Sequence, residues 1–215
     1  MEIRDRIKQK ADELYRRYGV KSVTMDEIAA QLGVSKKTIY HSFSDKNELV
    51  DAVIEDMLKY NRSCCTSYRR HSENAIHEVF LAMEMLQVMY SNMNPSILHD
   101  IERNHPETFK KFKEFKYRFL YDTMKENIER GIGEKLYRPE INVDVVVKAR
   151  LEVMMLPFNE EIFPKNKFSM VAVQEELIEL FLFGIASVKG YRLILRYQKK
   201  FRPVRNGKTT FNRML

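Results

Sequence analysis

Residues that interrupt helices are scarce in this sequence. Its 215 residues include only 7 glycines and 6 prolines, and tryptophan is absent. The low numbers of glycine and proline disfavour an all-β fold with its many turns. The longest apolar stretch, residues 177–188, contains Glu179 and is too short to cross a bilayer. The first residues, MEIRDRIKQKADE, lack the apolar core of a secretory signal. We therefore expect a helical cytoplasmic protein without a membrane partner.

Signatures of redox, metal and catalytic chemistry are also missing. The two cysteines, Cys64 and Cys65, are neighbours that we expect to remain reduced thiols. His99, Glu102 and His105 recur at three-residue steps, but no cysteine or second carboxylate reinforces them as metal ligands. There is no glycine-rich phosphate loop, nucleophile elbow or H-E-x-x-H motif. We predict no enzymatic activity, no metal and no cofactor.

The excess of positive charge lies at one end of the chain. Residues 1–59 carry equal numbers of acidic and basic side chains, whereas residues 189–215 carry nine Lys and Arg and no Asp or Glu. The net charge of +7 therefore says little about a nucleic-acid surface, which must be argued from a local basic cluster. Residues 201–215 are expected to form a poorly ordered basic tail. Three alternatives remain open for this tail: contact with DNA, contact with an anionic membrane surface, and no contact with either.

Two helical patterns open the chain. Apolar residues recur at helical spacing through residues 3–18, and Gly19 is placed to end that helix. Thr24 and Glu27 then form the T-x-x-E capping box with which a second helix begins. The sequence thus predicts two successive helices before residue 33.

A glycine separates the second helix from a third. Gly33 interrupts an otherwise helix-forming stretch, and a residue with positive φ at this point lets two short helices cross steeply. Ser35 can cap the third helix, from about residue 36 to 42, with Ile39 and Phe43 turned toward the core. The pattern predicts a helix-turn-helix, whose second helix can enter a DNA major groove.

Side chains suited to DNA contact cluster after this turn. Lysine can neutralise phosphates or reach guanine acceptors, threonine can touch a thymine methyl, and tyrosine and histidine can meet the sugar-phosphate backbone. The candidates are Thr24, Lys36, Lys37, Thr38, Tyr40, His41 and Lys46. Lysine pairs are also common on solvated helices, and helix-turn-helix geometry occurs in proteins that never bind DNA. These residues alone therefore leave DNA binding open.

A set of spaced residues in this region matches a known pattern. They are Thr24, Ile28, Ala29, Gly33, Val34, Ser35, Thr38, Ile39, Tyr40, Phe43, Lys46 and Leu49. With the spacing Y-x-x-F-x-x-K-x-x-L, the amino-terminal part of the chain resembles the DNA-binding domain of the TetR family of transcriptional regulators. Lys37 departs from the small residue, and Ser42 from the aromatic residue, that are frequent at these positions. These departures leave the operator sequence open.

The resemblance implies an all-α homodimer that binds double-stranded DNA. Each subunit would have a three-helix helix-turn-helix DNA-binding domain, here residues 1–50, followed by a larger helical domain, residues 51–200, for ligand binding and dimerisation. The seven candidates named above become DNA-contact residues on this basis.

Longer helical patterns fill the rest of the chain. They cover about residues 46–70, 74–92, 96–103, 107–130, 143–156 and 170–198. The resemblance implies that the last two pack against those of a second copy. Side chains that could line an apolar effector pocket are Phe80, Met83, Met89, Tyr90, Phe112, Phe119, Met124, Met154, Met155 and Phe158. For any one of them a place in the core is the simpler interpretation, so the effector-binding residues stay unknown.

Two functional hypotheses follow. The first is a ligand-responsive repressor, which binds a near-palindromic operator as a homodimer and is released by a small apolar effector. The alternative is a DNA-bound interaction protein of the same fold, which contacts a protein partner through its larger domain without a small effector.

Overall fold

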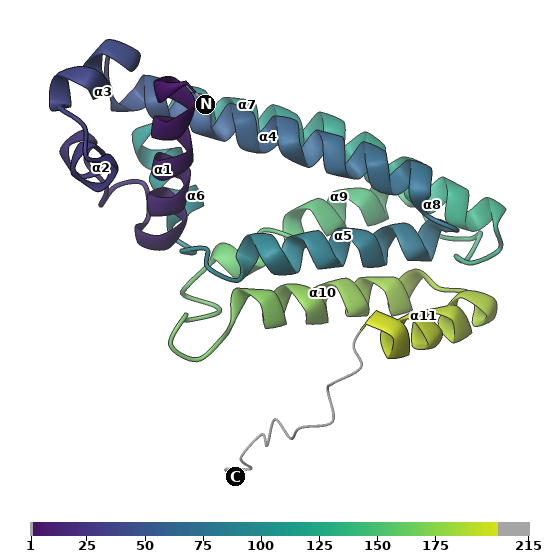
Figure 1. Ribbon diagram of the computed structural model, residues 1–215. Coiled ribbons are helices and arrows are strands. Elements are labelled where there is room, and N and C mark those ends of the chain that lie inside the picture. Colours follow the sequence, from purple (N-terminus) through teal and green to yellow (C-terminus); the bar gives the residue numbers. More distant parts are fainter. Residues whose placement is uncertain (1, 202–215) are drawn as a thin grey trace, which may run out of the picture.

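The computed structural model describes residues 2–201, which form helices joined by turns (Figure 1). In chain order the elements are α1 (Ile3–Tyr18), α2 (Met25–Leu32), α3 (Lys36–Ser42), α4 (Lys46–His71), α5 (Ala75–Tyr90), α6 (Ile97–Asn104), α7 (Pro106–Glu114), the π-helical turn η1 (Phe115–Leu120), α8 (Tyr121–Gly133), α9 (Val143–Val153), the 3₁₀ turn η2 (Leu156–Phe158), α10 (Met170–Ile185) and α11 (Val188–Phe201). Residues 2–201 contain no β-strand. The predicted all-α fold, with an N-terminal helix-turn-helix and a larger helical part, is confirmed.

The N-terminal helices lie at one end of the molecule. In Figure 1, α1, α2 and α3 gather around the start of α4, which then runs along the molecule beside α7. Helix α5 packs against α4, α8, α10 and α11, so it lies at the centre of the larger helical part. Helix α4 therefore belongs to both parts and joins them directly.

Two buried clusters follow this arrangement. In the first, Ile28 of α2 and Leu49 of α4 belong to the same core as Ile101 of α6. The second gathers side chains of α5, α8, α9, α10 and α11, with Leu151 and Leu182 at most 1% exposed. Helix α6 thus shares a core with the N-terminal helices, although it lies far from them in the sequence.

Capping side chains mark the starts of several helices, and the predicted caps Thr24 and Ser35 are among them. Thr24, Ser35 and Asn142 each accept a hydrogen bond from the backbone N–H three residues later. At the start of α4, the Asp45 carboxylate accepts a hydrogen bond from the backbone N–H three residues later. Local side-chain chemistry therefore decides where these helices begin.

Gly33 adopts the conformation that the predicted turn requires. Its φ of 66° and ψ of 33° are left-handed, and a Cβ here would meet no atom within 4 Å. A substitution would therefore strain the backbone without a steric clash. We expect Gly33→Ala to lower the free energy of unfolding by about 1 kcal/mol, and Gly33→Asn by less, because asparagine tolerates this region. Chemical denaturation measures both, and a Gly33→Ala variant as stable as the wild type would contradict the need for glycine.

The prediction of a single helix over residues 170–198 is wrong. Helix α10 ends at Ile185 and α11 begins at Val188. Backbone pairing with the turn after α8 breaks the helix, since the Arg138 N–H donates to the Ile185 carbonyl at 2.9 Å and the Ser187 N–H donates to the Leu136 carbonyl at 2.9 Å. These partners lie about 50 residues away along the chain, so the helical pattern could not reveal the break.

Two predictions remain, one about the carboxy-terminal tail and one about the membrane. Of the expected basic tail, residues 201–215, only Phe201 lies among the described residues, where it ends α11. Within residues 2–201, none of the helices has the length and apolar character needed to cross a bilayer.

Candidate DNA-binding surface and internal cavity

The apolar side of α3 holds this helix against the N-terminal core. Ile39 is fully buried and Phe43 is 1% exposed, as predicted. The Arg4 guanidinium lies 4.0 Å from the centre of the Phe43 ring and donates hydrogen bonds to the Ser42 carbonyl and the Glu48 carboxylate. Helix α1 thereby fixes the end of α3 against the start of α4.

The Glu48 carboxylate in this contact stays charged at neutral pH. It accepts hydrogen bonds from the Ser44 backbone N–H at 2.8 Å and from the Ser44 hydroxyl at 2.9 Å. The backbone bond from Ser44, followed by the bond from Arg4, lowers the pKa of Glu48 to about 2. Arg4 and Glu48 position α3, and no local motif pointed to Arg4, which lies about 40 residues before its partners.

The outward side of α3 carries most of the predicted DNA-contact residues. Those with exposed side chains are Thr24, Lys36, Lys37, Tyr40 and His41, whereas Thr38 is half-buried. The Lys36 ammonium pairs with the Asp26 carboxylate of α2. Thr38 shares a 2.8 Å hydrogen bond with the Ser35 hydroxyl. The Lys37 side chain has no hydrogen bond or ion pair to any other described residue, so its charge is free for another partner.

Lys46 is arranged differently from the other candidates. Its side chain is half-buried, and Nζ donates to the Lys21 carbonyl at 3.4 Å. Burial lowers the pKa of Lys46, and the nearby Asp100 carboxylate opposes this shift. The ammonium therefore bridges within the N-terminal part, and a phosphate contact would have to compete with this bond.

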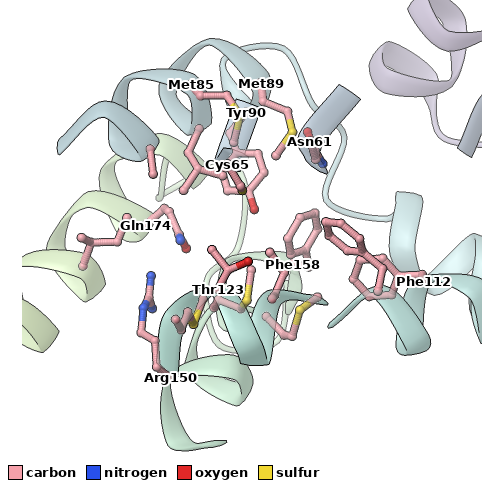
Figure 2. Close-up of a pocket in the computed structure, with 18 of the residues that line it drawn as sticks. Asn61, Cys65, Met85, Met89, Tyr90, Phe112, Thr123, Arg150, Phe158 and Gln174 are labelled. Atoms are coloured by element: carbon pink, nitrogen blue, oxygen red, sulfur yellow. The ribbon is translucent and has the colours of Figure 1, made fainter. Parts of the chain in front are cut away.

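A cavity of about 210 Å³ lies within the larger helical part. Its walls come from α4, α5, α6, α8, α9 and α10, among others, and are mostly apolar (Figure 2). The methionines that line it are Met57, Met85, Met89, Met93, Met124, Met154 and Met155. Such flexible, polarisable side chains let a binding site adapt to the shape of its ligand.

Helix α6 connects this cavity to the N-terminal helices. Ile97 and Ile101 line the cavity from α6, while Asp100 of the same helix accepts a hydrogen bond from the Lys21 backbone N–H at 2.9 Å. Just before α6, the Asn94 N–H donates to a carbonyl of α1 at 2.6 Å. One short helix thus contacts both the cavity and the segment between α1 and α2.

Residues 7–53 match the family model described as bacterial regulatory proteins, tetR family. The HTH-type transcriptional regulator SAB2452 of Staphylococcus aureus (strain bovine RF122 / ET3-1) is 30% identical over 135 residues, which cover 59% of this chain and 70% of that relative. The chain belongs to the TetR family. It is therefore a transcriptional regulator with a DNA-binding helix-turn-helix, as the resemblance implied.

Two further comparisons extend over more of the chain. The uncharacterized HTH-type transcriptional regulator YvaF of Bacillus subtilis (strain 168) is 25% identical over 170 residues, 77% of this chain and 87% of YvaF. The crystal structure of a TetR-family transcriptional regulator from Marinobacter aquaeolei VT8 has a TM-score of 0.72 at 17% identity, and the match covers 94% of this chain and 100% of that chain. The second comparison shows that the TetR fold extends over nearly the whole chain.

The apolar candidates for the TetR effector pocket divide into two groups. Those that line the cavity are Met89, Tyr90, Phe112, Met124, Met154, Met155 and Phe158. Phe80, Met83 and Phe119 lie elsewhere in the hydrophobic packing. Sequence reasoning missed the polar lining residues Arg150 and Gln174, because a single polar residue in a helical pattern does not reveal whether it faces solvent or a cavity.

The histidine pattern before α7 does not form a metal site in the part of the chain described. His99 and Glu102 are exposed, whereas His105 is buried. Residues 2–201 contain no group of three His, Cys, Asp or Glu side chains that could hold a metal ion.

Proposed function

We propose that this TetR-family regulator is a repressor, which binds a near-palindromic operator as a homodimer and releases it when a small molecule enters the cavity. The observation that carries this proposal is the pairing of an outward-facing, basic α3 with an apolar internal cavity in one chain. The cavity favours a small effector over the alternative, a regulator that responds only to a protein partner. Such a role places the chain in the cytoplasm and assigns it no enzymatic activity.

DNA contact is proposed for the seven residues predicted from the sequence. Lys37 and Tyr40 are the best placed, because Lys37 has no partner among the described residues and Tyr40 is 50% exposed. To bind DNA, Lys36 would give up its ion pair with Asp26, and Lys46 would give up its hydrogen bond to the Lys21 carbonyl. We also retain the proposed division into a DNA-binding domain of residues 1–50 and an effector domain of residues 51–200.

Release of DNA is proposed to proceed through α4 and α6. Both helices line the cavity, α4 through Ile54 and Met57 and α6 through Ile101, and both share the N-terminal core. A ligand that binds better when these helices are displaced shifts the population toward a spacing of the two α3 helices that no longer fits the operator.

A homodimer is proposed through the exposed sides of α9 and α10, continued by α11. The exposed large apolar residues on these helices are Val145, Leu180, Val188, Tyr191 and Leu195. Exposed Gly184 has open space around its Cα, which allows a second helix to approach closely. Large apolar side chains exposed in this way are typical of an interface between subunits.

The DNA-binding proposal predicts a specific loss of affinity. In a gel-shift titration against a duplex that the wild type selects from a random library, Tyr40→Ala is expected to weaken binding at least tenfold. The dimer presents two copies of Tyr40, and each lost hydrogen bond costs about 1 kcal/mol. Tyr60→Ala is the matched control, since Tyr60 is also exposed, at 64%, but lies on α4. Equal affinities of the two variants would argue against α3 as the recognition helix.

A further inference from the structure

Three side chains that line the cavity have a buried polar atom without a hydrogen-bond partner among the described residues: Asn61 through its Oδ1, Arg150 and Gln174. Arg150 and Gln174 lie on the neighbouring helices α9 and α10. Arg150 of α9 is 6% exposed, and its Nη1 has no hydrogen-bond partner among the described residues. Gln174 of α10 is 2% exposed, and the same holds for both its Oε1 and its Nε2. Figure 2 shows the two side chains pointing toward one another from neighbouring walls of the cavity. Buried polar groups are nearly always hydrogen-bonded, so a bound molecule is the natural partner for both.

The positive charge of Arg150 is not balanced by the cavity walls. The other lining residue with a formal charge is Glu78, which already pairs with Arg130 at 3.2 Å and with Arg69 at 3.4 Å. The guanidinium carbon of Arg150 lies 5.6 Å from the centre of the Phe181 ring. Burial lowers the pKa of Arg150 to about 10, so the side chain remains charged at neutral pH. A buried cation without a counter-charge destabilises a fold, and a bound anion would remove that cost.

The geometry of these groups favours a carboxylate. A guanidinium presents two parallel N–H donors that match the two oxygens of a carboxylate, and the Gln174 amide adds a further N–H donor. A single positive charge balances one negative charge, whereas a second charge on the ligand would lie among apolar walls.

The remainder of the cavity suits a hydrocarbon. Phe112 and Phe158 lie away from Arg150 in Figure 2, and the seven methionines named above complete the lining. Apolar walls of this kind stabilise a bound alkyl or aryl group by removing it from water.

We propose that the cavity binds an amphipathic monocarboxylate, with its carboxylate on Arg150 and Gln174 and its hydrocarbon body among the methionines, Phe112 and Phe158. This inference rests on the proposed function in that the ligand occupies the effector cavity. It names the chemical class of the effector, which the sequence left unknown.

The first test compares head groups of equal chain length. The full-length protein is titrated with straight-chain carboxylates from hexanoate to dodecanoate, and with octanol and octylammonium, while melting temperature and binding heat are recorded. At least one carboxylate is expected to bind saturably, and octanoate at least tenfold more tightly than octanol. Octylammonium should bind more weakly than either, because it brings a second positive charge to Arg150.

The second test removes the charge while it keeps the volume. Arg150→Met is expected to weaken carboxylate binding at least tenfold and to change octanol binding less than threefold. Without ligand, it should also melt at a higher temperature than the wild type, because an unpaired buried charge is gone. Gln174→Met should weaken carboxylate binding about threefold or more. Arg118→Met, at an exposed arginine of η1, is the matched control and should change neither affinity.

The opposite results would overturn the inference. It is wrong if no carboxylate of the series raises the melting temperature, or if Arg150→Met and Gln174→Met change carboxylate and octanol binding alike. A gel shift with the selected duplex separates this from the proposed function. If the protein binds the duplex but no carboxylate, only the proposed ligand class is contradicted. If the protein binds carboxylates but no duplex, the proposed repressor function is contradicted.

Discussion

Leu180→Glu is expected to convert the protein into monomers and to lower its affinity for a two-half-site operator at least a hundredfold. Leu180 is 71% exposed on α10, beside the open surface at Gly184. In the proposed dimer, two copies of a buried glutamate would face each other without counter-charges, which costs several kcal/mol. A monomer binds one half-site and loses the gain of two linked contacts, which commonly amounts to a factor of 10²–10⁴.

Light scattering and gel shift measure the two parts of this prediction. Val88→Glu is the matched control, because Val88 is 79% exposed on α5 and lies outside the proposed interface. It should leave both mass and DNA affinity unchanged. A Leu180→Glu protein that still has the mass of a dimer would show that another surface joins the subunits.

Gly190→Ala is expected to destabilise the protein far more than a methyl group added at an open helical position. A Cβ on this α11 glycine would lie 2.0 Å from the Leu136 carbonyl oxygen, so the backbone of one segment must move. Overpacking of this kind costs about 3 kcal/mol, and the melting temperature of a chain this long should fall by roughly 6–12 °C. The contact matters because the turn that contains Leu136 also breaks the helix between α10 and α11.

Thermal unfolding followed by circular dichroism provides the measurement. Gly133→Ala is the control, since Gly133 lies in α8 and a Cβ there would meet nothing within 4 Å. Alanine is the better helix former, so this variant should melt at or slightly above the wild-type temperature. Equal melting temperatures for the two variants would contradict the close packing of α11 on the turn.

Much of the N-terminal part could be predicted because its signals are local. The cap at Thr24, the left-handed turn at Gly33 and the buried positions Ile39 and Phe43 depend on residues within a few positions of each other. The same spacing carried the family resemblance, which the comparisons confirm. The individual DNA contacts remain predictions.

Long-range contacts explain what the sequence could not reveal. The phosphate contact of Lys46 remains a prediction, and the sequence did not reveal that its ammonium donates to the Lys21 carbonyl, 25 residues earlier. The helix break after Ile185 depends on carbonyl and N–H groups of the turn after α8. In both cases the deciding partner lies too far along the chain for a helical period or a short motif to record it.

The sequence by itself determined the all-helical fold, the helix-turn-helix and the family, because caps, turns and apolar spacing act over a few residues. Only the tertiary structure decided which of many apolar side chains line a cavity, and that Arg150 and Gln174 face it without partners. The physical reason is that burial and charge pairing depend on how separate helices pack against each other: α9 and α10 bring these two side chains to one cavity.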